Sequence, residues 1–93
     1  MEEALLVSKE ISMNKAYTAA TVKLPTDVVA TVSQPGTSLY GIQNVDRMII
    51  FGGGFPLEFN GKTIGGVGVS GGSVEDDMKV CQAALDVYKA ELK

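Results

Sequence analysis

Residues 51–72 read FGGGFPLEFNGKTIGGVGVSGG, and this stretch decides the fold. Asn60-Gly61 near its middle is the strongest hairpin signal in the chain, because both residue types tolerate the positive φ angles of a tight two-residue turn. We therefore predict one strand over residues 56–59 and a returning strand over residues 62–69. The apolar run Met48–Phe51 predicts a further short strand.

One face of the returning strand is almost bare backbone. Gly66 and Gly68 alternate there with Val67 and Val69, so their side of the strand carries no side chain. Either another element of the chain or a ligand must pack closely on such a surface.

The chain on both sides of this region is predicted to be helical, since all eleven glycines lie within residues 36–72. A first helix is expected over residues 3–23, ended by Pro25, and a short second helix over residues 27–32 with Thr26 as its N-cap. Residues 33–46 are expected to form a loop, anchored in the core by Leu39, Tyr40 and Ile42.

The last helix is predicted to begin after Ser73, whose hydroxyl is placed to cap it. Acidic residues at positions 75–77 complement the dipole of its first turn. Its apolar residues recur at helical spacing and predict a buried face: Val74, Met78, Cys81, Leu85, Tyr88 and Leu92. Because Cys81 lies in this stripe, we interpret it as a small core residue before a nucleophile.

Composition excludes several classes of function. A chain of 93 residues forms one domain, and 45% hydrophobic with 20% charged residues is typical of a globular protein. A net charge of -3 argues against nucleic acid as a partner. Neither a transmembrane stretch nor a signal-peptide pattern is present, which predicts a cytoplasmic protein without a membrane partner. One cysteine and no histidine exclude an internal disulfide and remove the commonest metal ligand and general base.

Two glycine motifs resemble nucleotide-binding sequences and are better explained otherwise. Residues 66–71 match G-x-G-x-x-G, but a dinucleotide site needs a second parallel strand after the next helix, and none follows within the 93 residues. Residues 60–63 resemble the end of a P-loop, but the first glycine of that motif falls on Pro56. A hairpin turn explains residues 60–63 better.

Lys15 is the most suggestive polar residue, with Tyr17 and Thr18 near it on the first helix. Lys15 could pair with an anionic ligand, and Tyr17 could stack on that ligand or bind a metal as a phenolate. A solvated lysine and a half-buried tyrosine explain the same spacing. Elsewhere Glu58 and the acidic residues at 75–77 have no evident catalytic partner.

Four segments taken together resemble one family. They are Asn14–Ala19, Gln34–Gly41, Phe51–Leu57 and Gly65–Gly72, and in this order they are similar to the GlcG/HbpS family. That family includes the C-terminal domain of PduO-type corrinoid adenosyltransferases. The resemblance covers nearly the whole chain and implies an α/β (α+β) fold, profilin-like in outline, in which helices flank an antiparallel sheet.

The resemblance also implies that the chain is N-terminally truncated relative to the family. Family members begin with a helix and a strand hairpin before the point that matches Met1. We therefore expect residues 1–93 to be a single domain that corresponds to about the C-terminal two-thirds of the family domain. A truncated sheet exposes an unpaired edge and apolar surface, and we predict that a partner chain covers them.

By resemblance, the chain is a small-ligand-binding protein for haem or a corrinoid-like tetrapyrrole such as cobalamin, and it forms a homo-oligomer. The glycines would let a flat ligand approach the backbone, Lys15 would neutralise a propionate, and aromatic rings would contact the ligand's face. The ligand-binding residues carried over in this way are Asn14, Lys15, Tyr17, Thr18, Phe51, Gly52, Gly53, Gly54, Phe55, Ser70, Gly71 and Gly72.

The absence of histidine leaves the axial ligand of a haem open. Where a family member uses a histidine from the preceding segment, this chain has none, and no separate metal site is expected. The ligand would come from another chain or from one of these residues: Met13, Lys15, Tyr17, Thr18, Met48, Met78 or Cys81. Two alternatives remain: a haem-degrading or cobalamin-linked accessory enzyme, and a ligand-free oligomeric assembly module whose glycines serve only packing.

Overall fold

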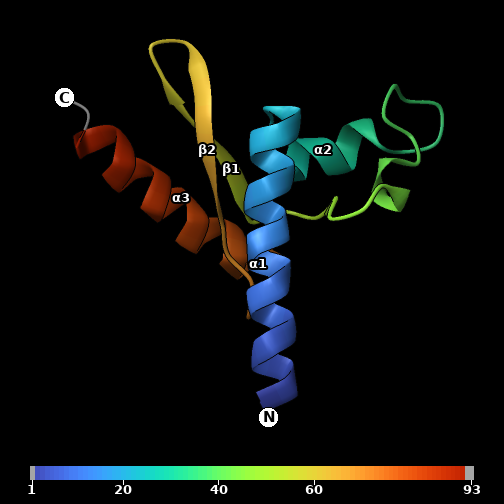
Figure 1. Cartoon of the computed structure of the whole chain (residues 1–93), viewed down its shortest axis with the longest axis horizontal. Coiled ribbons are helices and arrows are strands. Elements are labelled where there is room, and N and C mark those ends of the chain that lie inside the picture. Colours follow the sequence, from blue (N-terminus) through green and yellow to red (C-terminus); the bar gives the residue numbers. More distant parts are fainter. Residues whose placement is uncertain (1, 92–93) are drawn as a thin grey trace.

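The computed structural model describes residues 2–91, and the side chains of residues 7–91. Two strands form an antiparallel hairpin, with α1 along one side of it and α3 along the other (Figure 1). The elements in chain order are α1 (Glu2–Val22), α2 (Thr26–Val32), a 3-10 helix (Ile42–Asn44), β1 (Gly54–Phe59), β2 (Lys62–Gly68) and α3 (Val74–Glu91). The predicted α+β class, with helices flanking an antiparallel sheet, is confirmed.

The ends of the long helices follow from local sequence. α1 ends at Val22, and Lys23 turns the chain with a φ of 66° while its N–H donates to the Ala19 carbonyl at 2.8 Å. Pro25 then prevents the helix from continuing. At the start of α3 the Ser73 hydroxyl accepts the Asp76 N–H at 3.1 Å, so the predicted cap is confirmed.

The hairpin turn is the predicted one. Asn60 and Gly61 have φ angles of 51° and 77°, as a type I′ turn requires. The register places Gly54 opposite Gly68 and Leu57 opposite Gly65, with an irregularity between Leu57 and Glu58.

α1 lies directly on the glycine face of the hairpin. A Cβ atom at Gly66 would overlap the carbonyl oxygen of Ala16, and one at Gly68 would overlap that of Ser12. The backbone of α1 therefore approaches the sheet more closely than any side chain would allow. The sequence left open whether another element of the chain or a ligand packs on this face. In the structure it is α1.

The other face of the hairpin packs against α3. The Cys81 side chain is fully buried there, with Sγ 3.6 Å from the Val67 carbonyl oxygen, and Leu85 is buried one helical turn further on. The Tyr88 hydroxyl donates to the Glu58 carbonyl at 3.0 Å. The predicted core position of Cys81 is confirmed. Val74, predicted to lie in the same buried stripe, is 43% exposed because the first turn of α3 extends past the hairpin, and Leu92 lies outside the described residues.

Three local predictions are wrong. Met48–Phe51 forms no strand within residues 2–91, because the Ile49 N–H donates to the Thr18 hydroxyl of α1 at 2.9 Å and ties this segment to the helix. Thr26 is the first helical residue rather than the N-cap, and its buried hydroxyl accepts the Gly54 N–H at 2.9 Å. Tyr40 is 64% exposed and anchors nothing.

In the part of the chain that the structure describes, no helix combines the length and the apolar character needed to cross a bilayer. The first turns of α1 extend beyond the other elements (Figure 1).

Replacing Gly66 by Ala is expected to lower the free energy of unfolding by about 1–3 kcal/mol, because the new methyl group overlaps the α1 backbone, which has no flexible atom to move aside. Gly65→Ala is the matched control. The nearest atom to its Cβ is Leu57 Cδ1 at 3.9 Å, so it should be nearly neutral. Urea denaturation of both variants measures the difference, and equal stabilities would contradict the close packing of α1 on β2.

Candidate functional site

A buried ion pair joins α1 to α3. Lys15 is only 1% exposed, and its Nζ lies 3.2 Å from Oδ2 of Asp77 and donates to the Val69 carbonyl at 2.7 Å. The other carboxylate oxygen of Asp77 accepts the N–H of Gly72 at 3.0 Å. Lys15 Nζ also lies 5.3 Å from the centre of the Phe51 ring. Both charges are thus fully partnered, as burial requires.

The predicted partner of Lys15 was an anionic ligand, but in the structure its partner is the Asp77 carboxylate. The side chain of Lys15 does not reach the surface, so the geometry does not support its expected contact with a propionate. Gly53, with a φ of 119°, leaves the space that the Lys15 ammonium uses, since a Cβ there would lie 2.8 Å from Nζ. Gly52 is buried under Met78, and Gly54 lies against the Lys15 carbonyl and Thr26. These three glycines serve internal packing in the described chain.

The other predicted residues of α1 form a separate surface cluster with Arg47. The Arg47 guanidinium stacks on the Tyr17 ring, 3.9 Å from its centre, and Nε donates to the Asn14 side-chain oxygen at 3.3 Å. Thr18 is buried beneath them, its hydroxyl 2.8 Å from the Asn14 carbonyl oxygen. Sequence reasoning missed Arg47, which lies far from α1 in sequence and has a φ of 69°.

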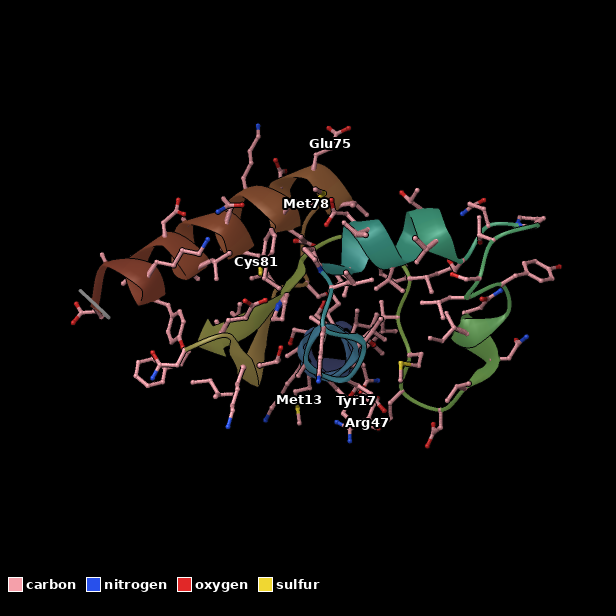
Figure 2. All side chains as sticks on the ribbon, turned by 90° about the horizontal axis from the view of Figure 1, so that it is seen from above. Met13, Tyr17, Arg47, Glu75, Met78 and Cys81 are labelled. Carbon is pink, nitrogen blue, oxygen red and sulfur yellow. The ribbon has the colours of Figure 1, made fainter. Side chains whose placement is uncertain are left out.

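The candidate axial ligands are dispersed rather than gathered. Met13 and Tyr17 are exposed on the side of α1 that also carries Arg47, and Figure 2 shows them away from Met78 and Cys81 of α3. Met48 and Met78 are half-buried, and Lys15, Thr18 and Cys81 are buried. The Met13 and Tyr17 side is one face of a single helix, so it is convex and would leave a flat ligand largely in water.

A concave site lies on the other side of the hairpin. It is a groove of about 480 Å³ between β1, the second half of α3 and the turn that follows α1. The lining residues are Lys23, Leu24, Pro25, Phe55, Pro56, Glu58, Gln82, Leu85, Tyr88 and Lys89. Apolar and aromatic side chains thus form most of the groove, and two exposed lysines contribute positive charge.

Among the predicted ligand-binding residues, Phe55 lines this groove. Ser70, Gly71 and Gly72 belong to the segment that connects β2 to α3. The Gly72 N–H donates a hydrogen bond to the Asp77 carboxylate. Sequence reasoning placed Leu85 and Tyr88 in the apolar stripe of α3 but gave no sign that Lys23 would lie beside them. No spacing motif connects these positions, because the fold alone brings three distant segments together.

Cys81 offers no reactive thiolate. Burial raises the pKa of its thiol, against the opposing effect of the nearby Lys15 charge. Within the described residues, no group of three or more acidic or cysteine side chains is arranged to hold a metal ion.

Comparison with known proteins places the chain in a family. The sequence model described as haem degrading protein HbpS-like matches residues 1–86. The chain belongs to the HbpS-like family. Its resemblance to the GlcG/HbpS and PduO C-terminal domains is thereby confirmed.

Relatives agree in fold and are longer. An uncharacterised 15.0 kDa protein of Citrobacter freundii is 50% identical over 95% of this chain and 63% of its own length. The crystal structure of protein ORFY from Klebsiella pneumoniae matches with a TM-score of 0.85 and 50% identity, over 97% of this chain and 63% of that one. A crystal structure of a PduOC:heme complex matches with a TM-score of 0.82 and 45% identity, over 92% of this chain and 64% of that one. The chain therefore spans somewhat less than two thirds of each.

Replacing Lys15 by Met is expected to cost about 3–5 kcal/mol of stability, since it leaves the Asp77 carboxylate buried without its countercharge. The double variant Lys15→Met/Asp77→Leu should recover most of that loss because no unpaired charge remains. Lys9→Met, at an exposed lysine of the same helix, is the control and should be nearly neutral. Chemical denaturation of these proteins, together with the single variant Asp77→Leu, completes the double-mutant cycle and measures the coupling; additive effects of the two single substitutions would refute it.

The Cys81 thiol is expected to react with a disulfide reagent at least about a hundredfold more slowly in the native protein than in denaturant, because it is buried and its pKa is raised. The reaction is measured by the absorbance of the thiolate that the reagent releases. Immediate reaction in native buffer would show that the α3 side of the hairpin is open.

Proposed function

We propose that the protein binds haem, or a tetrapyrrole of the same shape and charge, in the groove between β1 and α3. The observation that carries the proposal is the combination of a concave, aromatic-lined site with two lysines. The haem complex of the PduOC relative, at 45% identity, supports this ligand class over others.

The residues present suit the two halves of such a ligand. A porphyrin is a flat apolar ring with two carboxylates on one side, and Phe55, Leu85 and Tyr88 offer apolar surface to the ring. Lys23 and Lys89 offer a cation to each carboxylate. The volume of about 480 Å³ is in the range of small-molecule sites. The Met13–Tyr17 face, by contrast, could enclose a ring only between two chains.

The iron finds few ligands in the groove. Its ten lining residues include no imidazole, thiol or thioether, and the phenol of Tyr88 donates to the Glu58 carbonyl. Haem, when bound, supplies iron redox chemistry. The chain's own contribution is to hold the ring and its carboxylates and to exclude water from one side of the ring.

A second candidate is the ligand-free assembly module, and one observation favours it. Gly66 and Gly68 pack on α1, and Gly52, Gly53 and Gly54 pack on neighbouring side chains and backbone. The glycine content therefore needs no ligand to explain it. For an enzyme the groove offers a single carboxylate, Glu58, without an acid–base partner.

Haemin titrated into the protein is expected to give a saturable Soret shift. Lys23→Asn combined with Lys89→Gln should weaken binding about tenfold, since two ion pairs of about 0.5–1 kcal/mol are lost. Gln82→Trp should abolish saturable binding by filling the groove. Lys9→Gln combined with Lys62→Gln is the control matched in charge, because both lysines are exposed and lie outside the groove.

Unchanged affinity in both groove variants would place the ligand elsewhere. If the folded protein changes the absorption spectrum of neither haemin nor a cobalamin, the result would favour the assembly module. Loss of bound haem in the presence of a reductant, against a heat-denatured control, would favour the enzyme.

A further inference from the structure

The side chains that line the groove suit a flat ring with carboxylates better than they suit its central metal. In proteins, haem iron is held by histidine, cysteine, methionine or tyrosine side chains. Of these four types, the ten lining residues include only Tyr88. The exposed ammonium groups of Lys23 and Lys89 have no lone pair to offer a metal. Glu58 is the remaining charged residue, and carboxylates are better ligands for magnesium, calcium or manganese than for iron.

The hydroxyl of Tyr88 already has a partner. It donates to the Glu58 carbonyl at 3.0 Å and is thus directed at the backbone of β1. To bind iron as a phenolate it would lose its proton and this hydrogen bond. Tyr88 therefore offers its ring, and not its oxygen, to a ligand in the groove.

A thioether lies close to the groove, in a neighbouring hollow of about 370 Å³ that includes Met78. Phe55 and Gln82 line both spaces and so separate the groove from Met78. A Cβ atom at Gly52 would lie only 2.6 Å from the Met78 sulfur, so the thioether packs on that buried glycine. Met78 would have to leave this packing to reach the metal of a ring in the groove.

We propose, on the basis of the proposed function, that the groove recognises the porphyrin itself and takes the metal-free dicarboxylic porphyrin as readily as haem. Removal of the metal changes neither the flat apolar ring nor the two carboxylates. These are the parts of the ligand that the aromatic rings and the two lysines of the groove are placed to contact. The neighbouring reactions would be those that insert a metal into this ring or remove it.

The test compares the metal-free, zinc(II) and iron(III) forms of deuteroporphyrin, a vinyl-free and more soluble relative of protoporphyrin. Fluorescence of the first two forms and absorbance of the third give their dissociation constants. The three values are expected to agree within about threefold, since the metal makes no bond to the chain. Lys23→Asn combined with Lys89→Gln should weaken all three about tenfold. The control Lys9→Gln combined with Lys62→Gln should weaken none.

Tyr88→Phe and Met78→Leu test for a bond to iron. Each substitution is expected to change the three affinities by the same factor, because the metal takes no part in binding. A loss confined to the iron form in either variant would identify that residue as an axial ligand and overturn the proposal.

Two further results separate this proposal from the proposed function. If the iron form alone binds, or binds at least about tenfold more tightly than the metal-free form, and still depends on Lys23 and Lys89, the proposed function stands and metal-independent recognition is wrong. If no form binds the folded protein, or if the groove variant alters none of the three affinities, the proposed function fails and this proposal fails with it.

Discussion

The close contact between the backbone of α1 and the bare glycine face of the hairpin determines the rest of this structure. Because Gly66 and Gly68 carry no side chains, the helix backbone approaches the strand at Ala16 and Ser12. Only at that distance can Lys15 extend past Gly53 to reach Asp77 on α3. The ion pair and the glycine contact therefore support each other, since loss of either would move α1 away from the sheet.

This contact also determines where a ligand can bind. A glycine-rich face has two physical explanations, a helix or a flat ligand, and here the helix takes the space. What remains for a ligand is the opposite side, where β1 and α3 diverge to leave the groove that contains Phe55 and Tyr88.

Sequence reasoning was sufficient for features determined by neighbouring residues. The Asn60-Gly61 turn, the Ser73 cap and the buried positions of Cys81 and Leu85 depend on local spacing, and all three are confirmed. It failed where a distant group supplies the partner. Thr26 has the right chemistry for a cap, but Gly54 takes its hydroxyl.

The candidate site depends even more on residues that are distant in the sequence. Lys15 was identified as an unusual cation from its neighbours, yet its partner Asp77 is 62 positions away and could not be paired with it by spacing. Lys23, Phe55 and Tyr88 belong to three segments of the chain that only the fold brings together.

The central claim is that α1, rather than a ligand, fills the glycine face. Nuclear Overhauser spectroscopy of the folded protein, with and without zinc protoporphyrin as a diamagnetic haem analogue, tests it most directly. We predict strong cross-peaks between the α-protons of Gly66 and the α-proton of Ala16, and between the α-protons of Gly68 and the β-protons of Lys15. These cross-peaks should be unchanged by the porphyrin, while ligand-induced shifts concentrate at Phe55, Leu85 and Tyr88. Loss of those cross-peaks on addition of the porphyrin, with the largest shifts at Gly66 and Gly68, would contradict the account.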